Sequence, residues 1–305
     1  MFGSLARREW TSGSDVDWTL LVDGPADPQH RGAAQEFGRR LKEAGYRPPG
    51  PAKVFGNLAF SHDLIHRIGG EHDTNMNMTQ RLLLLLESTS LGTVDAHARV
   101  VRGIMRRYLE SERSFLAESG RRYKVPRFLL NDIVRYWRTV AVDYVSKQWE
   151  RGDEGWALRN VKLRYSRKLM FASGLLLCFS CYLDEPADVE HLLFKDEHEA
   201  AQKVQAHLAR KLGVPPLDIL CAALHGTVKK EMAARILSAY NLFLETMNDG
   251  EKRAQLKKLS PEASYADPIF KQLRDRSHEF GDGLTSLFYE GDEELRKLIL
   301  KYGVF

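Results

Sequence analysis

Near the start of the chain, the segment Asp15-Val16-Asp17-Trp18 alternates acidic and apolar side chains. Successive side chains of a strand point to opposite faces, so Asp15 and Asp17 share one face while Val16 and Trp18 enter the opposite layer. Two neighbouring carboxylates repel each other, and a divalent cation between them offsets that cost. The pattern therefore predicts a strand over residues 15–23 with one apolar face and one cation-binding face.

A Gly3-Ser4 turn opens the chain eleven residues before Asp15, and Arg7 follows it closely. Together these residues resemble the signature of the DNA polymerase β-type nucleotidyltransferase superfamily, in which a Gly-Ser turn and a short spacer lead to Asp-x-Asp on a strand. Without that resemblance, the same residues are read as a polar turn followed by an edge strand with two solvated aspartates.

The resemblance implies a nucleotidyltransferase that depends on two Mg²⁺ ions and takes a nucleoside triphosphate as its substrate. Asp15 and Asp17 would be catalytic residues that hold the metal ions, and a third carboxylate would complete the site. Gly3 and Ser4 would lie at the triphosphate, and Arg7 would pair with phosphate oxygens. The alternative for Arg7 is a surface arginine beside Glu9.

The third carboxylate is assigned by a second resemblance. Residues 73–88 are similar to the corresponding part of the bacterial PII-protein uridylyltransferase group, where an apolar run ends in an acidic and a small residue. On this match Glu87 is the catalytic and metal-binding carboxylate, with Asp73 as the reserve and Asp63 as a weaker choice. Five leucines precede Glu87; periodicity alone cannot separate a buried strand from a buried helix there, and Glu87 could also be a solvated terminus.

A basic cluster occupies residues 159–168. Related enzymes use a lysine and a hydroxyl residue of a C-terminal helix for the β- and γ-phosphates, so the resemblance assigns Lys162 and Ser166 to this role. The alternative is a solvated basic face. Arg135 and Arg138, on the preceding predicted helix, would either line the same cleft or pair with nearby aspartates.

The first 92 residues mix strand and helix signals, whereas the remainder has helical periodicity. The expected fold class is α+β, with a small mixed β-sheet nucleotidyltransferase domain (1–92) and an all-α helical bundle domain (93–305) that completes the nucleotide cleft. Only Met1 and Phe2 precede Gly3, so the domain is expected to lack its first strand. The remaining expectations are helices over 28–44, 94–116, 127–150 and 156–182, a short strand at 54–55, loop over 248–267, and a last helix pair from residue 268.

Composition limits the partners. The 305 residues carry a formal net charge of only +4, which disfavours a long nucleic-acid substrate. No apolar run has the length of a membrane span, and no signal-peptide pattern is present, which favours a cytoplasmic protein without a membrane partner. Cys178 and Cys181 form a C-x-x-C within an apolar run and are expected to be small core residues.

The predicted reaction moves a nucleoside monophosphate from a triphosphate to an acceptor hydroxyl. A protein side chain is the preferred acceptor, and a small molecule or an RNA end are alternatives. A catalytically inactive nucleotidyltransferase fold that serves as a protein-interaction scaffold is the other hypothesis, because the first strand is expected to be missing and more than one residue could be the third carboxylate.

Overall fold

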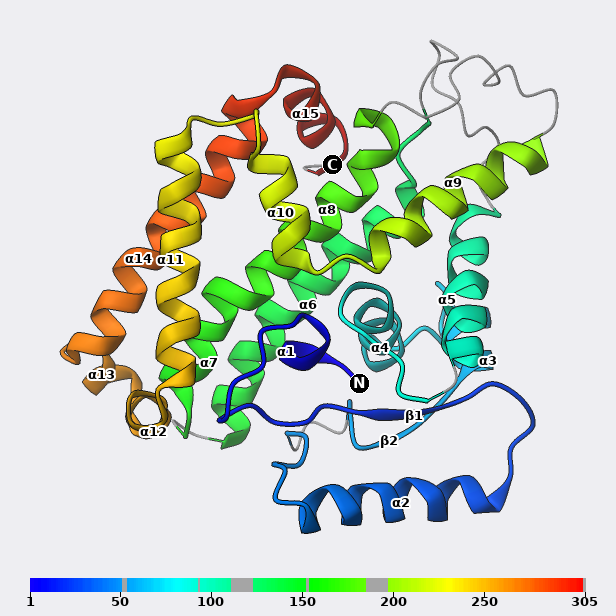
Figure 1. Cartoon of the computed structure of the whole chain (residues 1–305), viewed down its shortest axis with the longest axis horizontal. Coiled ribbons are helices and arrows are strands. Elements are labelled where there is room, and N and C mark those ends of the chain that lie inside the picture. Colours follow the sequence, from blue (N-terminus) through cyan, green and yellow to red (C-terminus); the bar gives the residue numbers. More distant parts are fainter. Residues whose placement is uncertain (51–53, 93, 111–122, 152–153, 185–196, 304–305) are drawn as a thin grey trace. The chain divides into compact units, whose positions relative to one another are not determined.

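The computed structural model describes residues 1–50, 54–92, 94–110, 123–151, 154–184 and 197–303 (Figure 1). The chain forms two compact units. Unit 1 comprises Met1–Trp10, Ser14–Asp132 and Ser180–Pro215. Unit 2 comprises Thr11–Gly13, Ile133–Phe179 and Pro216–Phe305. This division differs from the expected boundary between residues 92 and 93.

The sheet of unit 1 consists of two short parallel strands, β1 (Thr19–Val22) and β2 (Asn57–Phe60). Thr19 pairs with Asn57 and Val22 with Phe60. The α+β class is therefore confirmed in coarse terms, since the described residues are mostly helical with one small sheet. Instead of the expected mixed sheet, they contain this parallel pair and one isolated antiparallel bridge, Phe2 to Ser88.

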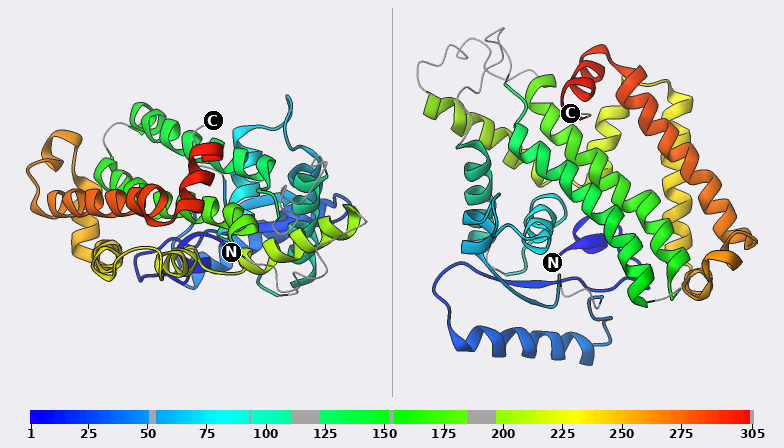
Figure 2. Two further views of the ribbon diagram at one scale, coloured as in Figure 1. Left: turned by 90° about the horizontal axis from the view of Figure 1, so that it is seen from above. Right: turned by 180° about the vertical axis from the view of Figure 1, so that it is seen from behind.

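Helix α2 (Pro28–Glu43) forms the crossover between the strands and lies along the sheet (Figures 1 and 2), in agreement with the helix predicted from residue 28. Its start is fixed by the Asp27 side chain, which accepts a hydrogen bond from the Gln29 N–H. Phe37 on its inner side packs edge-on against Trp18, with ring centroids 4.9 Å apart. The helix thereby covers the apolar side of the Asp15–Trp18 segment.

The leucine run belongs to a helix, α4 (Asn75–Leu86), and not to a strand. The Thr74 side chain caps it by accepting a hydrogen bond from the Asn77 N–H. All five leucines are buried. This part of α4 is therefore surrounded by protein, which explains why apolar residues occupy every side of it. The other helices with most of their residues in unit 1 are α1 (Gly3–Ala6), α3 (Ser61–His66), α5 (Val94–Leu109) and α9 (Glu197–Leu212).

The regular elements of unit 2 in the described residues are all helices. Its elements are α6 (Arg127–Arg151) and α8 (Lys168–Leu183), each of which also extends into unit 1, and α7 (Trp156–Lys162), η1 (Leu163–Arg167), α10 (Pro216–Leu224), α11 (Lys230–Asn248), α12 (Gly250–Lys258), α13 (Pro261–Ser264), α14 (Pro268–Ser286), η3 (Leu287–Gly291), α15 (Glu293–Leu298) and η4 (Ile299–Gly303).

The helix expected over 156–182 is confirmed, since α7, η1 and α8 follow one another without a break, and η1 is a single π-helical turn within it. One loop prediction needs correction. The loop expected over 248–267 contains α12 and α13, which begin at the capping side chains of Asp249 and Ser260. The helix predicted over 127–150 is confirmed by α6.

The core of unit 2 is aromatic and tightly packed. Tyr165 stacks on Phe243 with ring centroids 5.0 Å apart, and its hydroxyl donates a hydrogen bond to the Leu273 carbonyl oxygen at 2.8 Å. Helices α11 and α14 run side by side, and a Cβ on Gly283 would overlap the Ile236 side chain (Figures 1 and 2). Such a close approach requires glycine at this position.

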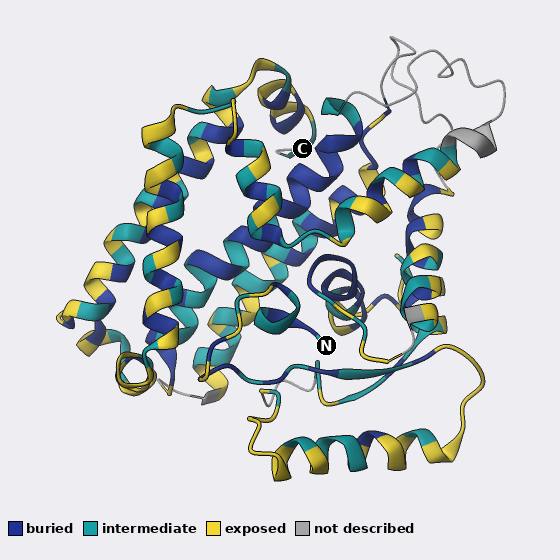
Figure 3. Cartoon of the chain, viewed as in Figure 1, coloured by how far each residue is buried: buried dark blue, intermediate teal, exposed yellow. Residues whose placement is uncertain are grey.

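Helix α8 is the most deeply buried helix of unit 2, whereas α2 of unit 1 exposes its outer side (Figure 3). Cys178 and Cys181 lie on α8 with no exposed surface, which confirms the predicted core role. Burial raises the pKa of the Cys181 thiol well above its usual range. Within the described residues, no helix combines the length and the apolar character needed to cross a membrane.

Candidate functional site

The Asp15–Trp18 segment directly precedes β1, which begins at Thr19, so the strand predicted over residues 15–23 is shorter in the structure. Val16 and Trp18 are buried in the core beside α2, while Asp15 and Asp17 are half-buried, in agreement with the predicted alternation. Backbone hydrogen bonds hold the segment: the Val16 N–H donates to the Arg47 carbonyl oxygen at 2.9 Å, and the Trp18 carbonyl oxygen accepts at 2.7 Å from a glycine N–H. The backbone that carries the two carboxylates is therefore fixed at both ends of the segment.

The Gly3-Ser4 turn lies directly against this segment. The Phe2 N–H donates a hydrogen bond to the Asp17 carbonyl oxygen at 2.9 Å. Gly3 has a φ of +66°, and a Cβ on it would lie 3.0 Å from Asp17 Oδ2. Both the backbone conformation and the close carboxylate require glycine there. The two parts of the sequence pattern, the Gly-Ser turn and the second aspartate, are thus neighbours in unit 1.

Arg7 lies between two carboxylates. Its Nε donates to Glu9 Oε2 at 2.8 Å, and its Nη1 donates to Glu87 Oε2. Arg7 and Glu87 are both buried. The next residue, Arg8, has a φ of +61°, a conformation that costs a non-glycine residue free energy. The arginine predicted to bind phosphate and the carboxylate predicted to bind metal therefore contact each other.

The donors at this site fit magnesium in part. Asp15 and Asp17 offer hard carboxylate oxygens, and Mg²⁺ is commonly held by one or two carboxylates together with water and substrate phosphates. Glu87 does not join them: among the residues that the structure describes, no three acidic, histidine or cysteine side chains are grouped so as to hold a metal ion. The residues thus suit a metal held by two carboxylates, with Glu87 bonded to Arg7 instead.

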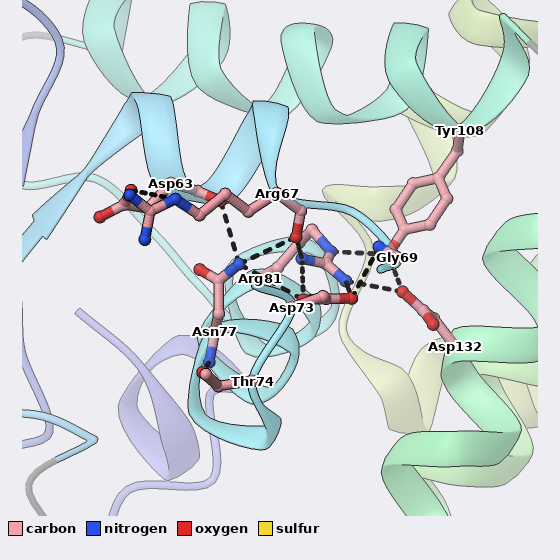
Figure 4. Close-up of polar contacts among 9 residues, drawn as sticks. All are labelled: Asp63, Arg67, Gly69, Asp73, Thr74, Asn77, Arg81, Tyr108 and Asp132. Carbon is pink, nitrogen blue, oxygen red and sulfur yellow. Dashed lines mark hydrogen bonds and ion pairs between the residues drawn. The ribbon is translucent and has the colours of Figure 1, made fainter. Parts of the chain in front are cut away.

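Asp73, the reserve for the third carboxylate, belongs to a different and fully buried network (Figure 4). Arg81 has no exposed surface and binds Asp73 through two hydrogen bonds, Nη1 to Oδ1 at 3.1 Å and Nη2 to Oδ2 at 3.0 Å. Its Nη2 also donates to Asp132 Oδ2 at 2.7 Å. Tyr108 completes the network, because its hydroxyl accepts from Arg81 Nε at 2.7 Å and donates to Asp132 at 2.6 Å.

The charges of this network stabilise each other. Burial alone would lower the pKa of Arg81, but the hydrogen bonds to Asp73, Tyr108 and Asp132 raise it overall. Burial raises the pKa of Tyr108, because it disfavours the charged phenolate. The hydroxyl therefore stays protonated and can donate a hydrogen bond.

Two further donors fill the remaining positions on Asp73. The Gly69 N–H donates to Oδ2 at 2.9 Å, and the Asn77 amide donates to Oδ1 at 3.3 Å. A carboxylate with this set of donors is a structural anchor between the end of α3 and the start of α4. Asp63, the weakest candidate, lies on α3 and pairs with Arg67 at 3.0 Å (Figure 4).

Lys162 and Ser166 belong to unit 2. The Ser166 hydroxyl is buried and donates to the Lys162 carbonyl oxygen at 3.1 Å, within its own helix. The Lys162 side chain is half-buried, as is that of Arg135, whereas Arg138 is exposed. The hydroxyl of Ser166 therefore has a partner other than a ligand, and the phosphate-binding role of both residues stays a prediction.

Sequence reasoning missed the role of Arg81. A charged residue directly before five leucines was a usable signal, because a buried cation needs a buried anion and Asp73 lies two helical turns earlier. The Arg7–Glu87 pair had no such signal, since 80 residues separate its members.

Comparison with known proteins found no matching family model, no matching curated protein and no matching solved structure.

Proposed function

We propose that the chain is a magnesium-dependent nucleotidyltransferase that transfers a nucleoside monophosphate from a triphosphate to an acceptor hydroxyl. The observation that supports this proposal most directly is the contact between Gly3 and the carboxylate of Asp17. It brings the Gly-Ser turn against the Asp-x-Asp segment, in which Asp15 is half-buried like Asp17.

In this reaction the acceptor oxygen forms a bond to the α-phosphorus, the bond from that phosphorus to the pyrophosphate oxygen breaks, and the hydroxyl proton passes to solvent water. Asp15 and Asp17 would hold the magnesium, which neutralises phosphate charge when bound. Gly3 and Ser4 are proposed to border the triphosphate. Glu87 is proposed to orient Arg7, since the two side chains are hydrogen-bonded and buried together.

The test is transfer of radiolabel from each of the four α-labelled triphosphates to a protein acceptor in cell lysate. We expect labelling with at least one triphosphate and Mg²⁺, and loss of labelling in the double variant Asp15→Ala/Asp17→Ala. Asp23→Asn is a matched control, because Asp23 follows β1 and pairs with the exposed Arg99. Persistent transfer in the double variant would remove Asp15 and Asp17 from the site.

A catalytically inactive scaffold for protein interaction is the second candidate. The Arg7–Glu87 pair favours it, because that pair uses the third carboxylate on an internal cation. Thermal unfolding with each triphosphate and Mg²⁺ separates the two functions. A nucleotide present at 100 times its dissociation constant stabilises the folded state by about 2.7 kcal/mol, whereas a scaffold gains no metal-dependent stability.

A further inference from the structure

The π-helical turn η1 places two cations side by side against α14 in unit 2. Arg164 and Lys168 lie four residues apart on one side of the helix. Arg164 Nη1 donates to Ser277 Oγ at 3.4 Å, and Lys168 Nζ lies 3.0 Å from the position that a Cβ on Gly281 would occupy. Ser277 and Gly281 are also four residues apart, so both cations face small side chains of the same helix.

The guanidinium of Arg164 is held in a defined orientation. Its Nε donates to Asn160 Oδ1 at 2.6 Å, and the Asn160 amide in turn donates to the Tyr144 hydroxyl at 3.0 Å. Ser277 is fixed as well, because its hydroxyl donates to the Arg274 carbonyl oxygen at 2.6 Å. Arg164 thus donates to neutral groups through its Nε and Nη1, and neither of these two hydrogen bonds involves its Nη2.

The two cations lack carboxylate partners. Among the ion pairs of the described residues, none includes Arg164 or Lys168, although both side chains are half-buried. The nearby acids form no ion pair with these cations: Glu279 pairs with Arg276, and Asp282 is an exposed residue of α14 that acts on Lys168 from a longer distance. Burial and the charge of Arg164 lower the pKa of Lys168, and Asp282 offsets this only in part.

Like charges at this spacing repel, and partial burial increases the cost of each unpaired charge. An anion bound between them would remove both costs. Guanidinium and ammonium groups that both lie beside small residues suit a tetrahedral oxyanion. Such an anion has several acceptor oxygens, some for the edge of the guanidinium and others for the compact charge of the ammonium group.

We propose that Arg164 and Lys168 form a binding site for a phosphate-type oxyanion, with Asn160 and Ser277 as positioning residues for the guanidinium. The site lies wholly in unit 2 and does not depend on the nucleotidyl transfer proposed above. Its ligand is either free phosphate or the phosphate end of a larger molecule such as a nucleotide.

The test is calorimetric titration of the full chain with inorganic phosphate, pyrophosphate and ATP, each with EDTA so that magnesium-dependent binding is silent. We expect saturable binding of at least one of the three titrants. Binding should be about tenfold weaker in Lys168→Met and in Arg164→Gln, because each variant loses a charge-assisted hydrogen bond to the anion. Lys271→Met is the matched control, because Lys271 is an exposed lysine of α14, the helix that the two cations face. Binding of phosphate alone would identify a free oxyanion, and binding only of ATP would identify a nucleotide phosphate.

A second measurement separates ligand binding from a structural role of Lys168. Without an added anion, Lys168→Met should unfold at the same or a higher temperature than the wild type, because it removes an unpaired charge. The double variant Asp15→Ala/Asp17→Ala should retain anion binding, so that failure of the transferase proposal leaves this site intact. The inference is overturned if no titrant binds, if Lys168→Met binds like the wild type, or if sodium chloride at equal ionic strength reproduces the heat.

Discussion

Replacing Arg81 with methionine should destabilise unit 1 severely. Arg81 is fully buried and binds both Asp73 and Asp132, whose exposed fractions are only 5% and 6%. Methionine has similar length but no charge, so the variant removes the guanidinium that the two buried carboxylates share. Asp73 keeps the Gly69 N–H and the Asn77 amide, and Asp132 keeps the Tyr108 hydroxyl.

The expected loss is about 3–5 kcal/mol, the range measured when one partner of a buried ion pair is removed. A domain of ordinary stability has about 5–15 kcal/mol in total, so Arg81→Met would lose a large part of it. Part of the loss should return in the double variant Asp73→Asn/Arg81→Met, because the asparagine removes one of the two carboxylate charges that Arg81 pairs with in the wild type.

The assay is urea unfolding followed by far-ultraviolet circular dichroism, with hydrogen exchange of α4 and α5 peptides to assign the loss to unit 1. Arg39→Met is the matched control, since Arg39 is an exposed arginine that also pairs with two carboxylates, Glu36 and Glu43. Its unfolding midpoint should equal that of the wild type, because exposed pairs are weak. A loss below about 1 kcal/mol for Arg81→Met would refute this prediction. It would also be refuted if the double variant lost as much unfolding free energy as the two single variants lose together.

Three other properties can be predicted. Gly3→Ala should destabilise unit 1 by about 1–2 kcal/mol in urea unfolding, because alanine is strained at positive φ; an unchanged midpoint would show that the turn relaxes. Burial lowers the pKa of His97, so the folded state binds its proton less readily than the unfolded state: its contribution to stability is complete above about pH 6.5 and is lost as the pH falls through the lowered native pKa. The thermal midpoint of His97→Gln should therefore fall less between pH 7 and pH 5 than that of the wild type, and equal slopes would contradict this. In the folded protein only Cys221 should react with a thiol reagent, because Cys178 and Cys181 are buried on α8; three fast thiols before unfolding would contradict the packing.

Local patterns predicted the elements whose side chains have two distinct faces. The alternation of Val16 and Trp18 with the aspartates, and the helical period of α2, follow from burial of one side only. The leucine run could not be resolved in this way, because a helix buried on all sides has no polar face to reveal its period. Helices α12 and α13 were missed although Asp249 and Ser260 are capping residues, since their short, polar sequences resemble loops.

The candidate site was predictable only in its local part. Asp15 and Asp17 alternate with the buried Val16 and Trp18, so the local pattern relates the two carboxylates directly. The partners of Arg7 and Glu87 depend on how the end of α4 approaches α1, which no local pattern encodes.

Unit 1 is built from separated stretches of chain, which affects how it is synthesised. Its sheet is too small to persist alone, and α3 rests on α5 through Ile65, whose side chain would lie 2.7 Å from a Cβ on Gly103. Helix α9 comes from residues 180–215. During synthesis, the amino-terminal part of unit 1 therefore cannot complete its fold until most of α6, α7 and α8 has been translated and α9, the last helix of unit 1, has emerged from the ribosome. Chaperones that shield apolar surface would act during this interval, and a fragment cut after residue 92 would remain permanently in that unfinished state.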